Sequence, residues 1–81
     1  MKRITGWFEA ADGADSGIAE LTREGFSAEE VEARMAPGNG VAVEIRCDDG
    51  RAAAAMRCLA AAGARRISME TLPAEEGAEP A

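Results

Sequence analysis

The sequence predicts an α+β sandwich, in which two helices cover one face of a four-stranded antiparallel sheet. Four short segments alternate apolar and polar residues with the two-residue period of a half-buried strand. Two longer segments, each closed by a glycine, have the composition of helices and separate the strands. The order along the chain is therefore strand, helix, strand, and then strand, helix, strand again.

The first strand is predicted over residues 1–8, where Ile, Thr, Trp and Phe favour extended backbone. A helix is predicted over residues 13–25, with a start anywhere from residue 11 to 16, and a C-terminal glycine ends it. We expect the inward face of this helix to be formed by Ile18, Leu21 and Thr22.

The acidic, glycine-rich segment 9–17 precedes and overlaps this helix. Asp12, Asp15 and Ser16 offer oxygen atoms, but the segment lacks the alternating ligands and the closing glutamate of a calcium loop. We therefore predict a helix-capping loop and no metal site.

The second strand is predicted over Val31–Met35, which alternates strictly. Ser27 with Glu30 is an N-cap signature, so a short helical turn is expected just before the strand. A helix that continues through Met35 is the competing interpretation. The turn residues Pro37–Gly40 end this element under either interpretation.

The second half of the chain repeats the pattern more clearly. Val41–Cys47 alternates as a strand, and Asp48-Asp49-Gly50 offers a helix cap. Residues 51–62 are alanine-rich and predict a helix that Gly63 ends, with a last strand over residues 66–72. The inward face of this helix is expected to hold Ala52, Met56, Leu59 and Gly63.

Two strand–helix–strand units pair as a split βαβ, which gives a ferredoxin-like βαββαβ sandwich with both helices on one face. The other face is then open. If Ile4, Gly6 and Phe8 point at the helices, alternation assigns the open face to Arg3, Thr5, Trp7, Glu32, Arg34, Ala42, Glu44, Arg46, Arg66, Ser68 and Glu70.

Several segments resemble the small bacterial general-stress (heat-induced stress) domains. They are the strand ending in Gly6-x-Phe8, the helix ending in REGF at residues 23–26, and the pattern VAV…DDGR…AGA over residues 41–64. The likeness spans roughly residues 4 to 70. It implies a ferredoxin-like fold and a role in the stress response, and it carries no catalytic residue to transfer.

Length and composition limit what such a chain can do. The 81 residues suffice for one domain, predicted over residues 1–72, with a thin core because 19 of the hydrophobic residues are alanine. Residues 73–81 contain three glutamates and no large apolar side chain, which predicts a disordered acidic tail. No apolar run approaches the roughly 20 residues that cross a bilayer, so we expect no membrane association.

The chemistry-bearing residues argue against catalysis. The chain has no histidine, which excludes Ser-His and Cys-His mechanisms. Its net charge is −6, which is unfavourable for binding nucleic acid. Cys47 and Cys58 are too far apart for a C-x-x-C motif, so we expect two reduced, inert thiols in a cytoplasmic protein. We predict no enzyme activity, no cofactor, no metal and no direct contact with nucleic acid.

The open face is the predicted functional surface. Trp7 is the only tryptophan, and on an exposed central strand it would be an interface anchor; the competing interpretation places it in the core or as a lid over the sheet edge. We predict a non-enzymatic protein-interaction module that docks a partner protein, or a second copy of itself. The predicted binding residues are Trp7, Glu32, Arg34, Glu44, Arg46 and Glu70.

Two other functions stay open at this point. A small, acidic, histidine-free domain is typical of phage-type inhibitors such as anti-CRISPR proteins, which occlude a nucleic-acid-binding surface of a host complex. A small-molecule-sensing regulatory domain is the other alternative, because ferredoxin-like domains often bind ligands at the ends of the sheet.

Overall fold

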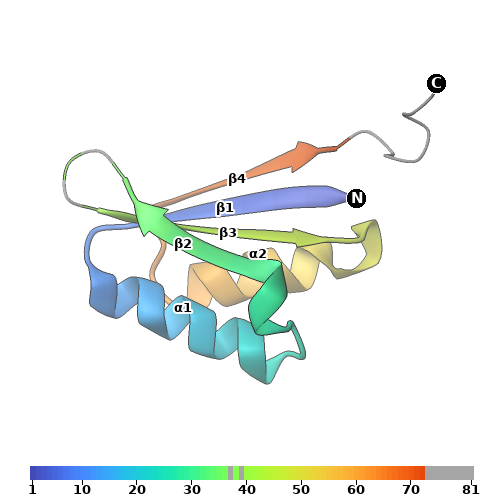
Figure 1. Ribbon diagram of the computed structural model, residues 1–81, viewed down its shortest axis with the longest axis horizontal. Helices are drawn as coiled ribbons and strands as arrows, with labels where there is room; N and C mark the ends of the chain where they lie inside the picture. Colours follow the sequence, from blue (N-terminus) through green and yellow to red (C-terminus); the bar gives the residue numbers. More distant parts are fainter. Residues whose placement is uncertain (37, 39, 73–81) are drawn as a thin grey trace.

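A computed structural model describes residues 1–36, 38 and 40–72, and it has the predicted architecture (Figure 1). One antiparallel sheet has the strand order β2-β3-β1-β4, and two α-helices lie on the same side of it. This is the ferredoxin-like βαββαβ sandwich. The elements are β1 (Lys2–Phe8), α1 (Ala11–Arg23), the 3-10 turn η1 (Ala28–Glu30), β2 (Val31–Met35), β3 (Val41–Cys47), the 3-10 turn η3 (Asp49–Arg51), α2 (Ala52–Ala61) and β4 (Arg66–Thr71).

The core lies between the sheet and the helices and is set by the alternation of the two central strands. Ile4 pairs with Ile45, and both side chains are fully buried beneath the helices. Leu21 from α1 and Leu59 from α2 are also fully buried and close the core from the helix side. The helix-facing side of the sheet is therefore the one that alternation predicts.

Gly6 explains how α2 approaches the sheet so closely. A Cβ atom on Gly6 would lie 3.1 Å from Cδ1 of Leu59 and 3.3 Å from its Cβ. Gly17 plays the same part in α1, where an added Cβ would lie 3.0 Å from Cζ of Phe8. The thin core is compact because these glycines admit large neighbours.

α1 starts at the first residue of its predicted range, whereas the predicted capping loop and inward face are corrected. The helix begins at Ala11, so most of the segment predicted as a capping loop is helical, and Ala10 occupies the N-cap position without a side-chain hydrogen bond. Thr22 is exposed, and its hydroxyl donates to the Ile18 carbonyl at 2.9 Å instead of facing the core. Ala14 and Gly17 take its place on the buried face.

The second helix differs from its prediction in two details. Asp48 makes no side-chain cap bond, and a 3-10 turn precedes α2; the neighbouring Asp49 instead pairs with the N-terminal amine at 3.2 Å. Gly63 is exposed past the end of the helix with φ +95°, a backbone conformation that favours glycine. Ala55 and Cys58 join Ala52 and Leu59 on the buried face.

The entry to β2 is held by side chains, and the strand prediction for Val31–Met35 is confirmed over the helical alternative. Oε1 of Glu30 accepts a hydrogen bond from the Ser27 amide at 2.8 Å, which completes the predicted capping box. Arg51 pairs with Glu30 at 3.4 Å, donates to the Gly25 carbonyl at 3.2 Å and stacks 4.0 Å above the Phe26 ring. We call Arg51 with these partners the Arg51 clasp.

Two of the four residues in the predicted turn, 37 and 39, and the predicted tail over residues 73–81 lie outside the described residues. Within the described part of the chain, neither helix has the length and apolar character that crossing a membrane requires.

Candidate protein-interaction face

The sheet face opposite the helices gathers every predicted binding residue. We call this surface the open face. The register sets Thr5 between Glu44 and Ser68, and Trp7 between Ala42 and Arg66. On β2, Glu32 lies across from Glu44 and Arg34 across from Ala42. Side chains from all four strands therefore share one surface.

Glu44 is the centre of this surface. Although it is charged, only 5% of the residue is exposed. Oε1 of Glu44 lies 3.0 Å from Arg34, and Oε2 lies 3.7 Å from Arg3 and 3.9 Å from Arg46. The carboxylate is buried because three arginine side chains from three strands cover it, and their charges offset the loss of water.

Arg3 extends the network to the fourth strand. Its Nη2 lies 2.6 Å and its Nε 3.0 Å from the same oxygen of Glu70. The hydrogen bonds that Arg3 donates to Glu70, and then the charge of Glu70, raise the pKa of the Arg3 guanidinium. An unbroken chain of charges therefore runs Arg34–Glu44–Arg3–Glu70 across β2, β3, β1 and β4. Arg3 is absent from the predicted binding residues, although alternation already places it on this face.

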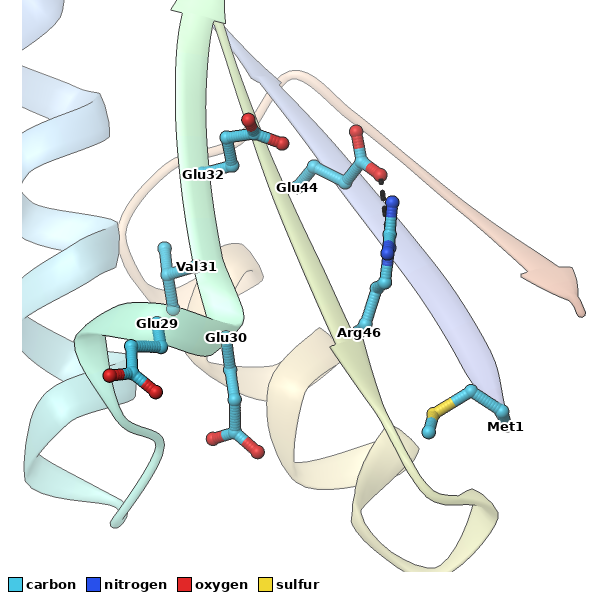
Figure 2. Close-up of a pocket in the computed structure, with 7 residues that line it drawn as sticks. All are labelled: Met1, Glu29, Glu30, Val31, Glu32, Glu44 and Arg46. Atoms are coloured by element: carbon cyan, nitrogen blue, oxygen red, sulfur yellow. Dashed lines mark ion pairs between the residues drawn. The ribbon is translucent and has the colours of Figure 1, made fainter. Parts of the chain in front are cut away.

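Among the described residues, Glu32 is the carboxylate of the face that the network leaves out. Figure 2 shows its carboxylate beside that of Glu44, while Arg46 reaches Glu44 from below. Among the described residues, no cation forms an ion pair with Glu32. Like charges directly opposite each other in a sheet are unfavourable, so Glu32 gains no stabilisation from its cross-strand neighbour.

A hollow of about 560 Å³ opens beside these residues at the start of β2. Its walls carry four carboxylates and one arginine (Figure 2). Within residues 1–36, 38 and 40–72, no group of three His, Cys, Asp or Glu side chains is arranged to hold a metal ion. The lining residues are Met1, Glu29, Glu30, Val31, Glu32, Glu44 and Arg46.

Trp7 lies on the open face of the central strand β1 and is half-buried. The guanidinium carbon of Arg66 lies 5.1 Å from its ring centroid, in the range of a cation–π contact. Trp7 lines two hollows of about 450 Å³ each. One continues over the sheet toward Thr5 and Arg34, and the other runs over the sheet end toward Gly38 and Arg65. Trp7 is thus outside the core and lies between two recesses, with Arg66 over its ring.

Charge is distributed unevenly over the molecule. The open face carries four arginines, Arg3, Arg34, Arg46 and Arg66, against three glutamates. The rest of the sequence has five basic and twelve acidic residues. The open face is therefore weakly positive on a protein whose net charge is −6. Arg34 and Arg46 are accessible to a partner, with 59% and 62% of their side chains exposed.

The two cysteines are free and lie on the helix side, away from this surface. Burial, followed by the charge of Asp48, raises the pKa of the Cys47 thiol. Burial, followed by the charge of Glu24, raises the pKa of the Cys58 thiol. Both groups are therefore kept in the protonated form, which is the weaker nucleophile.

Comparison with known proteins assigns the chain to no family. No protein-family model and no curated protein matches the chain.

Proposed function

We propose that this protein is a non-enzymatic interaction module that docks an acidic segment of a partner protein on its open face. The single observation that supports this most is the position of Trp7, half-buried between two recesses on the central strand and flanked by exposed arginines. Tryptophan and arginine are the residue types that dominate binding energy at protein interfaces.

The size of the surface fits such a role. A four-stranded sheet face is comparable to the roughly 800 Å² that each partner contributes to a stable interface. Much of the face is already ordered, because the ion-pair chain from Arg34 to Glu70 fixes its long side chains before a partner arrives. Preorganised side chains lose less conformational entropy on binding.

The charge of the face selects the chemistry of the partner. Arg34, Arg46 and Arg66 are exposed, and among the described residues Glu44 pairs with the first two and Trp7 lies beneath the third, so carboxylates of a partner can reach their guanidinium groups. A nucleic-acid strand is disfavoured by the −6 net charge of the whole chain. Mimicry of a nucleic acid would also require an acidic docking face, whereas this one is weakly basic.

The proposal is tested by affinity capture from the lysate of the native host, followed by mass spectrometry. Wild type is compared with Trp7→Ala and Arg46→Glu, with Arg57→Glu as the matched control, because Arg57 is exposed on α2 away from the open face. Circular dichroism first establishes that all variants fold. We expect a partner that is retained by wild type and Arg57→Glu and lost by the other two.

Further steps separate this proposal from its rivals. Binding of the purified partner should weaken as salt is added, because exposed ion pairs are screened. A partner held equally by all four proteins would overturn the choice of surface. Capture of a nucleic-acid-binding complex through the open face would point to an inhibitor that acts by occlusion.

A further inference from the structure

We infer that a second copy of this chain pairs with the outer edge of β2, so that two sheets join into one through an antiparallel β2–β2 contact. This interface is formed by the backbone edge of β2 and shares Glu32 and Arg34 with the border of the open face. The inference does not rest on the function proposed above. It rests on three features of β2: its free backbone groups, its charge pattern and its exposed methionine.

The backbone of β2 presents a free row of hydrogen-bonding groups. β2 is an edge strand and pairs only with β3 in the described part of the chain. The Ala36 amide donates to the Gly40 carbonyl at 2.9 Å. In this register the even-numbered residues of β2 therefore direct their backbone N–H and C=O groups toward β3. Because inward-facing groups alternate along an antiparallel pair, the peptide groups of Val31, Ala33 and Met35 face outward. They are available to another strand.

The side chains of β2 are self-complementary about Ala33. If two copies pair antiparallel with Ala33 opposite Ala33, every Glu32 faces the Arg34 of the other copy. On the opposite side of the strand, every Val31 faces a Met35. The free outward groups lie on residues 31, 33 and 35, and in this register they meet one another. One register therefore satisfies the hydrogen bonds, the charges and the apolar contacts together.

This pairing supplies what the single chain lacks. Glu32 faces the like charge of Glu44 and has no ion-pair partner among the described residues, and the second copy's Arg34 provides one. Met35 is 75% exposed, the highest value among the exposed large hydrophobic residues described, and Val31 of the other copy would cover it. The two open faces would lie side by side on one continuous sheet.

The other edge strand, β4, gains less from the same arrangement. Pairing about Ser68 would set Arg66 opposite Glu70, but both side chains already have partners, because Glu70 is bonded twice to Arg3 and Arg66 lies over Trp7. On β2 only Arg34 has an ion-pair partner, Glu44, among the described residues. Its exposed methionine, Met69, is only 48% exposed. We therefore assign the contact to β2 and use β4 as the control edge.

Disulfide trapping tests the geometry. Residues at position 33 of the two copies would have Cα atoms about 5.5 Å apart, within the range that a disulfide spans. Mild oxidation of Ala33→Cys should give a covalent dimer. Wild type should not crosslink, because Cys47 and Cys58 are only 3% and 6% exposed. Ser68→Cys is the matched control on β4 and should stay monomeric.

Charge exchange tests the register independently. Sedimentation of wild type at increasing concentration should show a monomer–dimer equilibrium. Glu32→Arg alone or Arg34→Glu alone should weaken the dimer about tenfold, because two favourable cross-strand pairs become two repulsive ones. The double variant should restore it. Glu32→Arg places a cation opposite Glu44, so loss of the dimer in that variant would not reflect unfolding.

The inference is overturned if wild type stays monomeric at all concentrations. It is also overturned if Ser68→Cys crosslinks in place of Ala33→Cys, which would assign the contact to β4. A dimer that both single charge variants preserve would place the interface on another surface.

Discussion

Glu44 and Glu32 are neighbours of the same type in different surroundings, and this contrast gives the first prediction. Glu44→Gln removes the charge that three arginines surround and should lower the free energy of unfolding by about 1–2 kcal/mol. Glu32→Gln removes a like-charge contact and should be neutral or raise it by a few tenths of a kcal/mol. Urea unfolding at low protein concentration measures both. Equal losses would show that the ion-pair network is not what separates them.

A second residue-scale prediction concerns the close contact at Gly6. Gly6→Ala places a methyl group 3.1 Å from Cδ1 of a fully buried leucine, Leu59, which has little room to move. The free energy of unfolding should fall by about 1–3 kcal/mol. Gly50→Ala is the matched control, because an added Cβ there meets nothing within 4 Å. A stable Gly6→Ala variant would mean that α2 can shift away from the sheet.

The buried thiols predict how stability depends on pH. Burial raises the pKa of Cys47 and of Cys58 in the folded state, so the protonated form favours folding. The contribution of the buried thiols to the free energy of unfolding is complete at pH values below the unfolded thiol pKa of about 8.5. It is lost as the pH rises through the pKa of the thiols in the folded state.

Urea midpoints at neutral and alkaline pH should show this loss, and the loss should be smaller in Cys58→Ala than in wild type. The reverse ordering would mean that the alkaline loss comes from groups other than this thiol.

Among the elements, the Arg51 clasp predicts the behaviour of a whole segment. It ties the end of α1, the turn η1 and the start of α2 together through Gly25, Phe26 and Glu30. Arg51→Ala should lower the free energy of unfolding by about 1–2 kcal/mol. Arg51→Lys should restore only part of this loss, because an ammonium group lacks the planar, several-donor geometry of the guanidinium.

Arg57→Ala is the control for an exposed arginine on α2. Hydrogen exchange should locate the loss of protection in η1 and β2. Uniform loss across the sheet would contradict a local role for the clasp.

The ends of an element could be predicted where its own residues show a local pattern, such as strict alternation or a capping side chain. Val41–Cys47 was predicted with the correct ends because strict alternation is visible in the residues themselves. The start of α1 could be predicted only as a range, residues 11 to 16, because Ala10 carries no capping side chain and two glycines weaken the helix pattern.

The membership of the open face also followed from alternation, whereas the burial of Glu44 did not. That burial depends on three long side chains from three strands converging on one point, and only the assembled sheet determines this.

For the whole molecule, the proposed β2 contact predicts that stability depends on concentration. A dimer of folded chains stabilises the folded state by mass action, so the thermal midpoint of wild type should rise with protein concentration. Glu32→Arg should show the same rise only at about tenfold higher protein concentration. Differential scanning calorimetry measures both, and a concentration-independent midpoint for wild type would argue against the contact.

The position of Trp7 has a consequence for how the molecule can be observed. The chain has one tryptophan and no tyrosine, and that tryptophan lies on the open face outside the core. Its fluorescence therefore reports the solvent environment of the docking surface, while Phe8 and Phe26 remain in the interior. A ligand on the sheet would shift this emission without any change in the core, so the protein carries its own optical reporter at the surface where binding is proposed.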